Sequence, residues 1–454
     1  MAQTHPRSRK ASTSPESFLE CLRYFLTPQV WKQAHRALGG SCGSRWLPQS
    51  LLFVLLTMTW CWGESQPERF ETAKAFYIAN YQKRRRPGQT IEGFQKALAR
   101  VPAAALRAVA QAVRARLQQV FADRLVVDRF IPIGCDGSRL ACPRSQELEQ
   151  RLGVSSHDGT PPQLWVTALV HLSTGLLWAW RLGTGSASER QHLLQLLATL
   201  PRSALLVADA GYVGYDLLET LVNRRISFLI RFASHAGVYA VEPRRPGRWR
   251  DGPIDYWPKK IQRQHRPPLR LRLLRLRGRK ADVWLLTNVF DPAQLSLPTA
   301  GRFYRWRWGN EGLFRTYKRT LGKVKLMSRT LALAHREAEG SLLAVQLLLA
   351  HGALVLPRPN TSRPALPSAR QVLLAIRAEI RNQTGMYLGP RQQRSYRQRL
   401  RQARRDARRQ RTNKVRRRWT TRADHRPPEP PHILKMGTIL KERLAKMLEK
   451  AKAG

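Results

Sequence analysis

Residues 204–216, ALLVADAGYVGYD, are the stretch that decides the predicted fold. Ala204–Ala208 is short and entirely apolar, which is typical of a strand buried on both faces of a sheet. Asp209 follows directly, and an acid at the carboxyl end of such a strand opens into the crevice where α/β sheets bind ligands. A helix is predicted at Tyr215–Asn223, so the stretch indicates an α/β sheet with a candidate functional acid at its edge.

The segments on either side extend this α/β pattern. Ser188-Glu189-Arg190-Gln191 has the form of a capping box that opens an apolar helix at His192–Leu200. The turn Ser173-Thr174-Gly175 separates two predicted strands. The order strand, strand, strand, helix, strand, helix, strand predicts a mixed sheet covered by helices. The further predicted strands are Arg129–Leu140, Trp165–Leu172, Leu176–Leu182, Ile226–Arg231 and Val283–Val289.

Composition divides the chain into four regions. The first has apolar residues at helical spacing and many basic residues, so it is predicted to be helical and to bind DNA. An α/β core follows, and a segment rich in Arg and Pro interrupts it as a β-rich insertion. A basic extension comes last, where the segment 391–418 alone has fourteen Lys or Arg residues. The predicted regions are residues 1–125, the core at 126–232 and 282–356, the insertion at 233–281, and the extension at 357–454.

The charge of the chain predicts a polyanionic partner. The 454 residues include 80 Lys or Arg and 30 Asp or Glu, a formal net charge of +50. Such a surface repels itself unless it meets a polyanion, and DNA and RNA are the commonest ones in a cell. A membrane surface is the weaker alternative. The apolar runs Leu51–Trp62 and Leu342–Leu356 predict buried helices, because the first is too short for a span and the second contains Gln346 and His351.

The five cysteines predict reduced thiols in a cytoplasmic protein. Their number is odd and no C-x-x-C pair is present, so neither a disulfide framework nor a zinc site is expected. No apolar segment of signal-peptide type follows the basic N-terminus.

Three acids are candidates for phosphoryl-transfer chemistry on DNA. Such chemistry uses divalent metal ions held by convergent carboxylates, since magnesium prefers oxygen ligands. Asp136 lies in the first predicted strand, Asp209 ends the buried strand, and Glu311 lies on a long helix predicted after Pro298. Each acid taken alone also has a structural explanation, and Asp128 and Asp158 compete with Asp136 on sequence grounds.

The predicted long helix carries a stripe of polar residues around Glu311. Tyr304, Arg307, Glu311 and Lys318 are offset by three, seven and fourteen residues, which places them within an arc of roughly 60° on one continuous helix. Phe303–Trp308 interleaves aromatics and arginines, a pattern suited to gripping phosphates and stacking on bases. A solvated amphipathic face with an Arg307–Glu311 pair is the other interpretation.

These residues resemble a known family. The spacing from Tyr304 to Lys318 resembles the Y-R-E-K signature of DDE transposases from bacterial insertion sequences of family four. IGCDGSRLACPRS around Asp136 and LLVADAGYVGYDLL around Asp209 look like the first and second aspartate motifs of that family. The resemblance covers about residues 126 to 350. In the second motif it departs at Ala210, where many relatives have a larger or charged residue.

The resemblance implies a ribonuclease H-like catalytic core with a β-rich insertion between the second Asp and the Glu. It implies that Asp136, Asp209 and Glu311 are catalytic and hold two Mg²⁺ ions, for which Mn²⁺ can substitute. It also implies that Tyr304, Arg307 and Lys318 contact the transposon-end DNA near the cut.

The function predicted on this basis is metal-dependent DNA cleavage and strand transfer at the ends of an insertion sequence. The expected partners are double-stranded DNA at the transposon ends and target, and a second copy of the chain on DNA, with no membrane. The expected location is the bacterial cytoplasm, associated with the nucleoid. Two alternatives stay open: a nuclease or recombinase of the same fold that cuts without joining, and a decayed transposase that only binds DNA.

Overall fold

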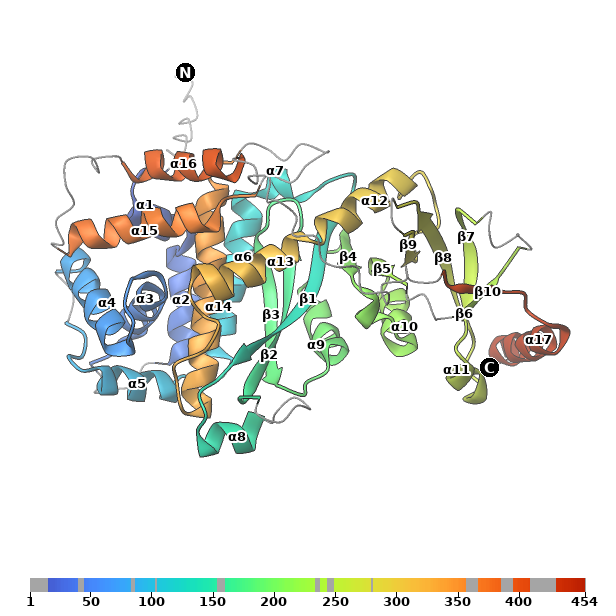
Figure 1. Cartoon of the computed structure of the whole chain (residues 1–454), viewed down its shortest axis with the longest axis horizontal. Coiled ribbons are helices and arrows are strands. Elements are labelled where there is room, and N and C mark those ends of the chain that lie inside the picture. The colour runs from blue at the N-terminus through green and yellow to red at the C-terminus, as the bar shows by residue number, and fades with distance from the viewer. Residues whose placement is uncertain are drawn as a thin grey trace, which may run out of the picture.

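The computed structural model describes residues 15–39, 45–82, 86–102, 104–152, 160–232, 237–242, 249–278, 281–356, 366–384, 395–408 and 430–453. Within this part, ten strands form one sheet in the order β10-β6-β7-β8-β9-β5-β4-β1-β2-β3, flanked by helices (Figure 1). The sheet contains both parallel and antiparallel neighbours. The mixed α/β class predicted from the sequence is therefore confirmed.

One end of the sheet has the arrangement of a ribonuclease H-like core. β1 (Ile131–Ala141) is antiparallel to β2 (Gln163–His171), which is antiparallel to β3 (Leu177–Thr184). On the other side of β1, β4 (Ala204–Ala208) and then β5 (Ser227–Arg231) run parallel to it. The turn between β2 and β3 is the predicted one.

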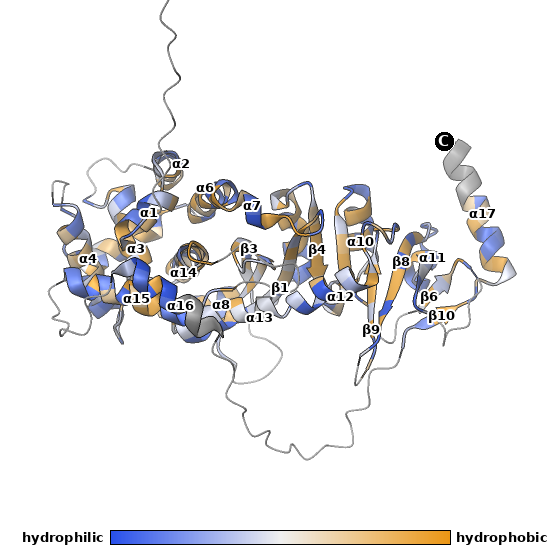
Figure 2. Cartoon of the chain, turned by 90° about the horizontal axis from the view of Figure 1, so that it is seen from above, coloured by the Kyte–Doolittle hydropathy of each residue, from blue (hydrophilic) through white to orange (hydrophobic). Residues whose placement is uncertain are grey.

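Apolar strand sequences and short helices account for the local structure of this core. Every residue of β4 is buried, as its unbroken apolar sequence predicts, and Figure 2 colours this strand as hydrophobic. Ser188 is the N-cap of α9, but its side chain makes no capping hydrogen bond, so the predicted capping box is wrong. The connecting helices are α8 (Gln146–Leu152), α9 (Glu189–Leu196), η1 (Leu197–Thr199), η2 (Ala210–Tyr212) and α10 (Tyr215–Asn223).

The strands of residues 233–281 join the same sheet. β9 (Val283–Thr287) pairs antiparallel with both β5 and β8 (Leu269–Leu276), so hydrogen bonding is continuous from the core outward. Arg272 is buried on β8 and donates hydrogen bonds to both carboxylate oxygens of Asp251 on β7. The remaining elements here are β6 (Gly237–Ala240), β7 (Asp251–Tyr256) and α11 (Lys259–Arg263).

Helices make up the described N-terminal residues, as predicted. Side chains of Ser17, Thr27, Ser65 and Thr90 accept hydrogen bonds from the first turns of four of them, which satisfies backbone donors that a helix leaves unpaired. The helices are α1 (Phe18–Phe25), α2 (Pro28–Leu38), α3 (Pro48–Trp60), α4 (Gln66–Asn80), α5 (Ile91–Arg100), α6 (Ala105–Val120) and α7 (Ala122–Leu125).

The buried helix α14 (Leu331–Ala353) joins these helices to the sheet. It contacts α3, α5 and α6 among the N-terminal helices and β3 of the sheet (Figure 1). Two of its buried polar side chains have internal partners: Gln346 donates to the Leu177 carbonyl at 3.1 Å, and His351 Nδ1 lies 2.8 Å from the Tyr396 hydroxyl. No helix in the described ranges is long and apolar enough to cross a membrane.

The described parts of the C-terminal region pack on both ends of the molecule. α15 (Ala369–Gln383) and α16 (Tyr396–Arg408) contact α14, whereas β10 (His432–Leu434) pairs with β6 and precedes α17 (Thr438–Ala453). Tyr396 and Leu400 of α16 are buried, in agreement with their helical spacing. Cys21, Cys61, Cys135 and Cys142 are buried free thiols, and Cys42 lies outside the described residues.

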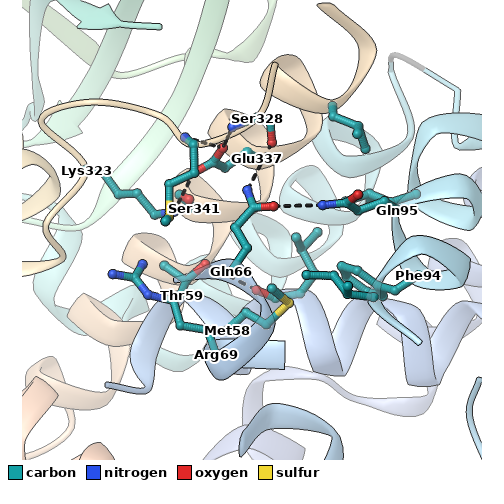
Figure 3. Close-up of a pocket in the computed structure, with 15 residues that line it drawn as sticks. Met58, Thr59, Gln66, Arg69, Phe94, Gln95, Lys323, Ser328, Glu337 and Ser341 are labelled. Carbon is teal, nitrogen blue, oxygen red and sulfur yellow. Dashed lines mark hydrogen bonds and ion pairs between the residues drawn. The ribbon is translucent and has the colours of Figure 1, made fainter. Parts of the chain in front are cut away.

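A polar network closes the junction between α14 and the N-terminal helices. Glu337 on α14 accepts hydrogen bonds from the Lys323 ammonium at 2.7 Å and from the backbone N–H groups of Met327 and Ser328 at 2.9 Å. Gln66 on α4 donates to Ser328 and accepts from Gln95 on α5 (Figure 3). The segment that precedes α14 is thus fixed from both sides.

Candidate active site

Asp136 and Asp209 lie side by side on neighbouring parallel strands. The register of β1 and β4 pairs Ile131 with Ala204 and continues to Gly134 with Val207. Two residues further along each strand, the same register sets Asp136 opposite Asp209. Because in-register residues of parallel strands face the same side, the two carboxylates share one edge of the sheet. Both are partly exposed, as a site open to a ligand requires.

Each aspartate is fixed by the backbone that follows it. The Asp136 Oδ1 accepts a hydrogen bond from the Gly137 N–H at 2.9 Å. The Asp209 Oδ1 accepts one from the Ala210 N–H at 2.8 Å, and Asp209 thereby caps the short helix η2. These bonds restrain the carboxylates to defined positions at the strand ends.

Two arginines flank Asp209. An Arg231 Nη1 lies 3.9 Å from Asp209 Oδ1, and an Arg307 Nη2 lies 3.7 Å from Asp209 Oδ2. Arg231 ends β5, whose register with β4 pairs Ile230 with Ala208 and so places Arg231 beside Asp209. Sequence analysis missed Arg231. Its position at the end of the strand after Asp209 is the signal that could have found it.

The helix predicted after Pro298 is interrupted, so the prediction of one continuous helix is wrong. α12 (Leu297–Trp306) ends in a turn, α13 (Gly309–Arg315) begins after it, and a π-helical turn, η4 (Thr316–Thr320), follows. The roughly 60° arc assumed a regular α-helix and does not survive these changes of register. α12 contacts β4 and α13 contacts β1.

Glu311 and the predicted DNA contacts Tyr304, Arg307 and Lys318 are distributed over these three helical segments and the turn between the first two. Glu311 lies in α13, the helix against the strand that carries Asp136, and its side chain is outside the described part of the structure. Arg307 is 4% exposed and stacks on the rings of Tyr304 and Trp308, with its guanidinium carbon 5.3 and 5.1 Å from their centroids. Burial raises the pKa of Tyr304. Arg307, at the end of α12, thus pairs with Asp209, and Tyr304 of α12 packs against Arg307.

Lys318 lies beyond α12 and α13, in the π-helical turn η4. It is half-buried, and burial lowers its pKa.

The two competing acids differ from Asp136. Asp128 lies in a turn with φ of 46° and pairs with Arg302, which gives it a structural role. Asp158 lies outside the described residues.

The donor chemistry at the sheet edge suits a hard divalent cation. Asp136 and Asp209 supply carboxylate oxygens, the ligands that magnesium prefers. The described residues contain no group of three His, Cys, Asp or Glu side chains placed to hold an ion, and the Glu311 carboxylate is not among them.

Fold and site together define a ribonuclease H-like α/β domain with two in-register aspartates at its edge. Residues 136–347 match the family model of the transposase DDE domain, a segment that contains Asp136, Asp209 and Glu311. This match supports a DDE transposase. No curated protein matches the chain.

Among solved structures, the chain is similar to a piggyBac transposase, seen by cryo-electron microscopy as a synaptic complex with hairpin DNA. The TM-score is 0.44 at 10% sequence identity, and the alignment covers 85% of each chain.

Proposed function

We propose that this protein is a transposase that cuts DNA at the ends of an insertion sequence of bacterial type and joins those ends to target DNA. The observation that carries the proposal is the placement of Asp136 and Asp209 in register on parallel strands, within the segment that matches the transposase DDE domain. Glu311 is the third member of this catalytic set, supported by the contact of its helix with β1.

Carboxylates at this edge would hold two Mg²⁺ ions, or Mn²⁺ in their place. When bound, the ions supply positive charge that activates the attacking oxygen and stabilises the leaving one. Asp136 and Asp209 contribute preset oxygen ligands, because their backbone hydrogen bonds fix them before any ligand arrives.

The arginines beside Asp209 would orient the DNA backbone. Arg231 and Arg307 place two cations next to the carboxylate, so a phosphate can approach with less repulsion. Tyr304 and Trp308 stack on Arg307 and fix its position. Lys318 would contact end DNA further along the helical segment.

Other parts of the chain would recognise DNA and pair its ends. The N-terminal helices and the basic C-terminal region carry much of the +50 net charge, which suits binding to the phosphate backbone. We propose a homodimer on DNA, in which each copy acts at one end, in the bacterial cytoplasm and close to the nucleoid.

The test is DNA cleavage with Mg²⁺ by the full chain and three variants, Asp136→Asn, Asp209→Asn and Glu311→Gln. Cleavage of end DNA should fall at least about a hundredfold in each, since a metal-ligating charge is lost. Binding of end DNA should survive. Asp128→Asn is the matched control and should cut at a rate close to that of the unmodified protein.

Wild-type cleavage by Asp209→Asn would refute the catalytic assignment. Products joined to target DNA distinguish a transposase from a nuclease of the same fold. An unmodified protein that binds end DNA but never cuts it would instead be the decayed form.

A further inference from the structure

A cavity of about 180 Å³ lies beside β3 and shares no lining residue with the candidate active site. β3 is the terminal strand of the sheet, and β2 separates it from β1, which carries Asp136. Helix α6 forms one wall of the cavity, β3 forms the second, and α9 with η1 forms the third. A single water molecule needs only roughly 10–15 Å³ of cavity, so this one has room for a small ligand.

Helix α6 presents two arginines on the face that lines the cavity. Arg107, Ala110, Gln111 and Arg114 are spaced at i, i+3, i+4 and i+7, so they share one side of the helix. Ala110 carries only a methyl group between the two arginines, which leaves space there. Both arginines are half-buried, so their charges are drawn partly out of water.

β3 supplies a fixed wall and a third arginine. Trp178 and Trp180 are buried. The Trp178 indole N–H donates to the Thr199 carbonyl at 2.9 Å. The Trp180 indole N–H donates to the Glu339 carboxylate at 2.6 Å. Arg181 follows on the same strand, is half-buried, and adds a third guanidinium to the lining of the cavity.

Acidic side chains compensate only one of these three arginines. Arg107 forms an ion pair with Glu339, which is fully buried. Arg114 donates a long hydrogen bond of 3.5 Å to the Trp178 carbonyl. In the part of the chain that the structure describes, neither Arg114 nor Arg181 forms an ion pair with a carboxylate. Two partly buried positive charges thus border the cavity without a counter-charge, which is unfavourable unless an anion binds there.

Arginines also occur at such positions for packing alone, with the stem over apolar side chains and the charged group in water. That arrangement needs no shared cavity, whereas all three arginines here line the same one. A guanidinium binds phosphate through two parallel N–H···O bonds. A terminal phosphate carries a charge of about −1.5 to −2 at neutral pH, so it matches two uncompensated cations better than a carboxylate does.

We propose that the cavity between α6, β3 and α9 binds a terminal phosphate group, carried by a free nucleotide or by a DNA 5′ end. Arg114 and Arg181 are the principal phosphate ligands, and Arg107 is held beside them by Glu339. The site goes beyond the proposed function, because none of these residues belongs to the cleavage site.

Calorimetric titration of the full-length protein with adenosine 5′-monophosphate and with adenosine tests this site, at a salt concentration that screens exposed charges. The nucleotide should bind, and adenosine should not bind measurably. Arg114→Gln should weaken nucleotide binding at least about tenfold, because a charged hydrogen-bond donor to the phosphate is lost. Arg370→Gln, at an exposed position in the first turn of α15, removes the same charge and should bind the nucleotide as the unmodified protein does.

Equal nucleotide affinities of Arg114→Gln and Arg370→Gln would overturn the proposal, as would equal binding of adenosine and the nucleotide, or no nucleotide binding by the unmodified protein. Thermal melting shows whether each variant is folded at the titration temperature. If Arg114→Gln is unfolded there, Arg181→Gln decides by the same comparison.

DNA duplexes with and without 5′ phosphates identify the source of the phosphate. A preference for the phosphorylated duplex that Arg114→Gln abolishes assigns the site to a DNA end. Nucleotide binding without any such Arg114-dependent preference assigns it to a free nucleotide. DNA cleavage plays no part in these measurements, so failure of this site would leave the proposed function untouched.

Discussion

Arg307 is a buried cation with incomplete hydrogen bonding. Its Nε has no partner among the described residues, and its Nη2 lies 3.7 Å from the Asp209 carboxylate. A buried charge without full compensation is costly, and the rings of Tyr304 and Trp308 beside the guanidinium offset part of that cost. A phosphate at the sheet edge would complete its hydrogen bonds.

Arg307→Lys should therefore impair cleavage although it keeps the charge. Lysine lacks the planar guanidinium, so it stacks less well on the two rings and cannot bind phosphate in a bidentate way. We expect cleavage of end DNA to fall by about tenfold. Arg305→Lys, at an exposed position near the end of α12, is the control. Equal rates for the two variants would show that the guanidinium is dispensable.

The interruption of the signature helix is the main feature at the level of elements. A π-helical turn at Thr316–Thr320 contains Lys318, and such turns occur frequently at functional sites. α12 and α13 diverge at Arg307-Trp308, which allows one segment to reach β4 and the other β1. A straight helix would not present both segments to the two strands in this way.

Local patterns predicted single elements well. Ala204–Ala208 and Tyr215–Asn223 have the predicted ends, because their apolar runs begin and end with clear signals. The break at Arg307-Trp308 was not predictable, since helical periodicity continues through it in the sequence. Pairing between distant strands, such as β10 with β6, depends on long-range contacts that periodicity does not encode.

The candidate site was predictable only in part. Asp209 stands out because it follows a fully apolar strand, and the register with β1 then places Asp136 beside it. Arg231 was missed, although it ends the strand that follows Asp209, because the pairing of β5 with β4 that places it beside Asp209 is a long-range contact.

The ion pair of Lys323 and Glu337 links the segment after η4 to α14 and should contribute to the stability of the protein. Both side chains are buried, so Glu337→Gln leaves the ammonium without a counter-charge and should destabilise the protein by about 3–5 kcal/mol. Glu149→Gln, in an exposed pair with Arg144, should cost less than about 1 kcal/mol. Urea unfolding of both variants measures the difference, and equal midpoints would contradict the expectation.

The same pair predicts a pH dependence. Burial alone would raise the pKa of Glu337, but Lys323 and two backbone N–H groups outweigh it and lower the pKa below its ordinary value of 4.5. Because the pKa of Glu337 is lower in the folded than in the unfolded protein, its ionised form stabilises the fold at pH values above the unfolded pKa. This stabilisation is lost as the pH falls through the folded pKa. The free energy of unfolding of the unmodified protein should therefore exceed that of Glu337→Gln by a constant amount near neutral pH, and this difference should shrink below about pH 4.5. An advantage that grows on acidification would refute this assignment.

At the scale of the whole molecule, one hydrophobic core spans the N-terminal helices and the ribonuclease H-like sheet. Residues of α3, α14 and β3 belong to the same buried cluster. α14 packs against both regions. If either region unfolded alone, the apolar surface of α14 that it covers would become exposed to water. We therefore expect the two regions to unfold together.

Gly340→Ala tests this joint core. A β-carbon at Gly340 would lie 2.6 Å from Leu55 Cδ2 and 2.7 Å from its Cγ, so α14 and α3 would have to separate slightly. Overpacking of this kind costs about 1–3 kcal/mol. Calorimetry should show one transition at a lower temperature. The control, Gly437→Ala, has nothing within 4 Å and should melt normally. Two separate transitions would contradict a shared core.

The pairing of β10 with β6 has a consequence for synthesis on the ribosome. β6 ends at Ala240 and its partner begins at His432, so 191 residues lie between the two strands in the chain. At elongation rates of about 5–20 residues per second, the nascent polypeptide spends roughly 10–40 s with that side of β6 unpaired. An unpaired strand edge is a template for another chain. When neighbouring ribosomes translate one messenger RNA, the unpaired edge of β6 in one nascent chain can therefore pair with a strand of another nascent chain. Misassembly between chains is most favoured at this stage.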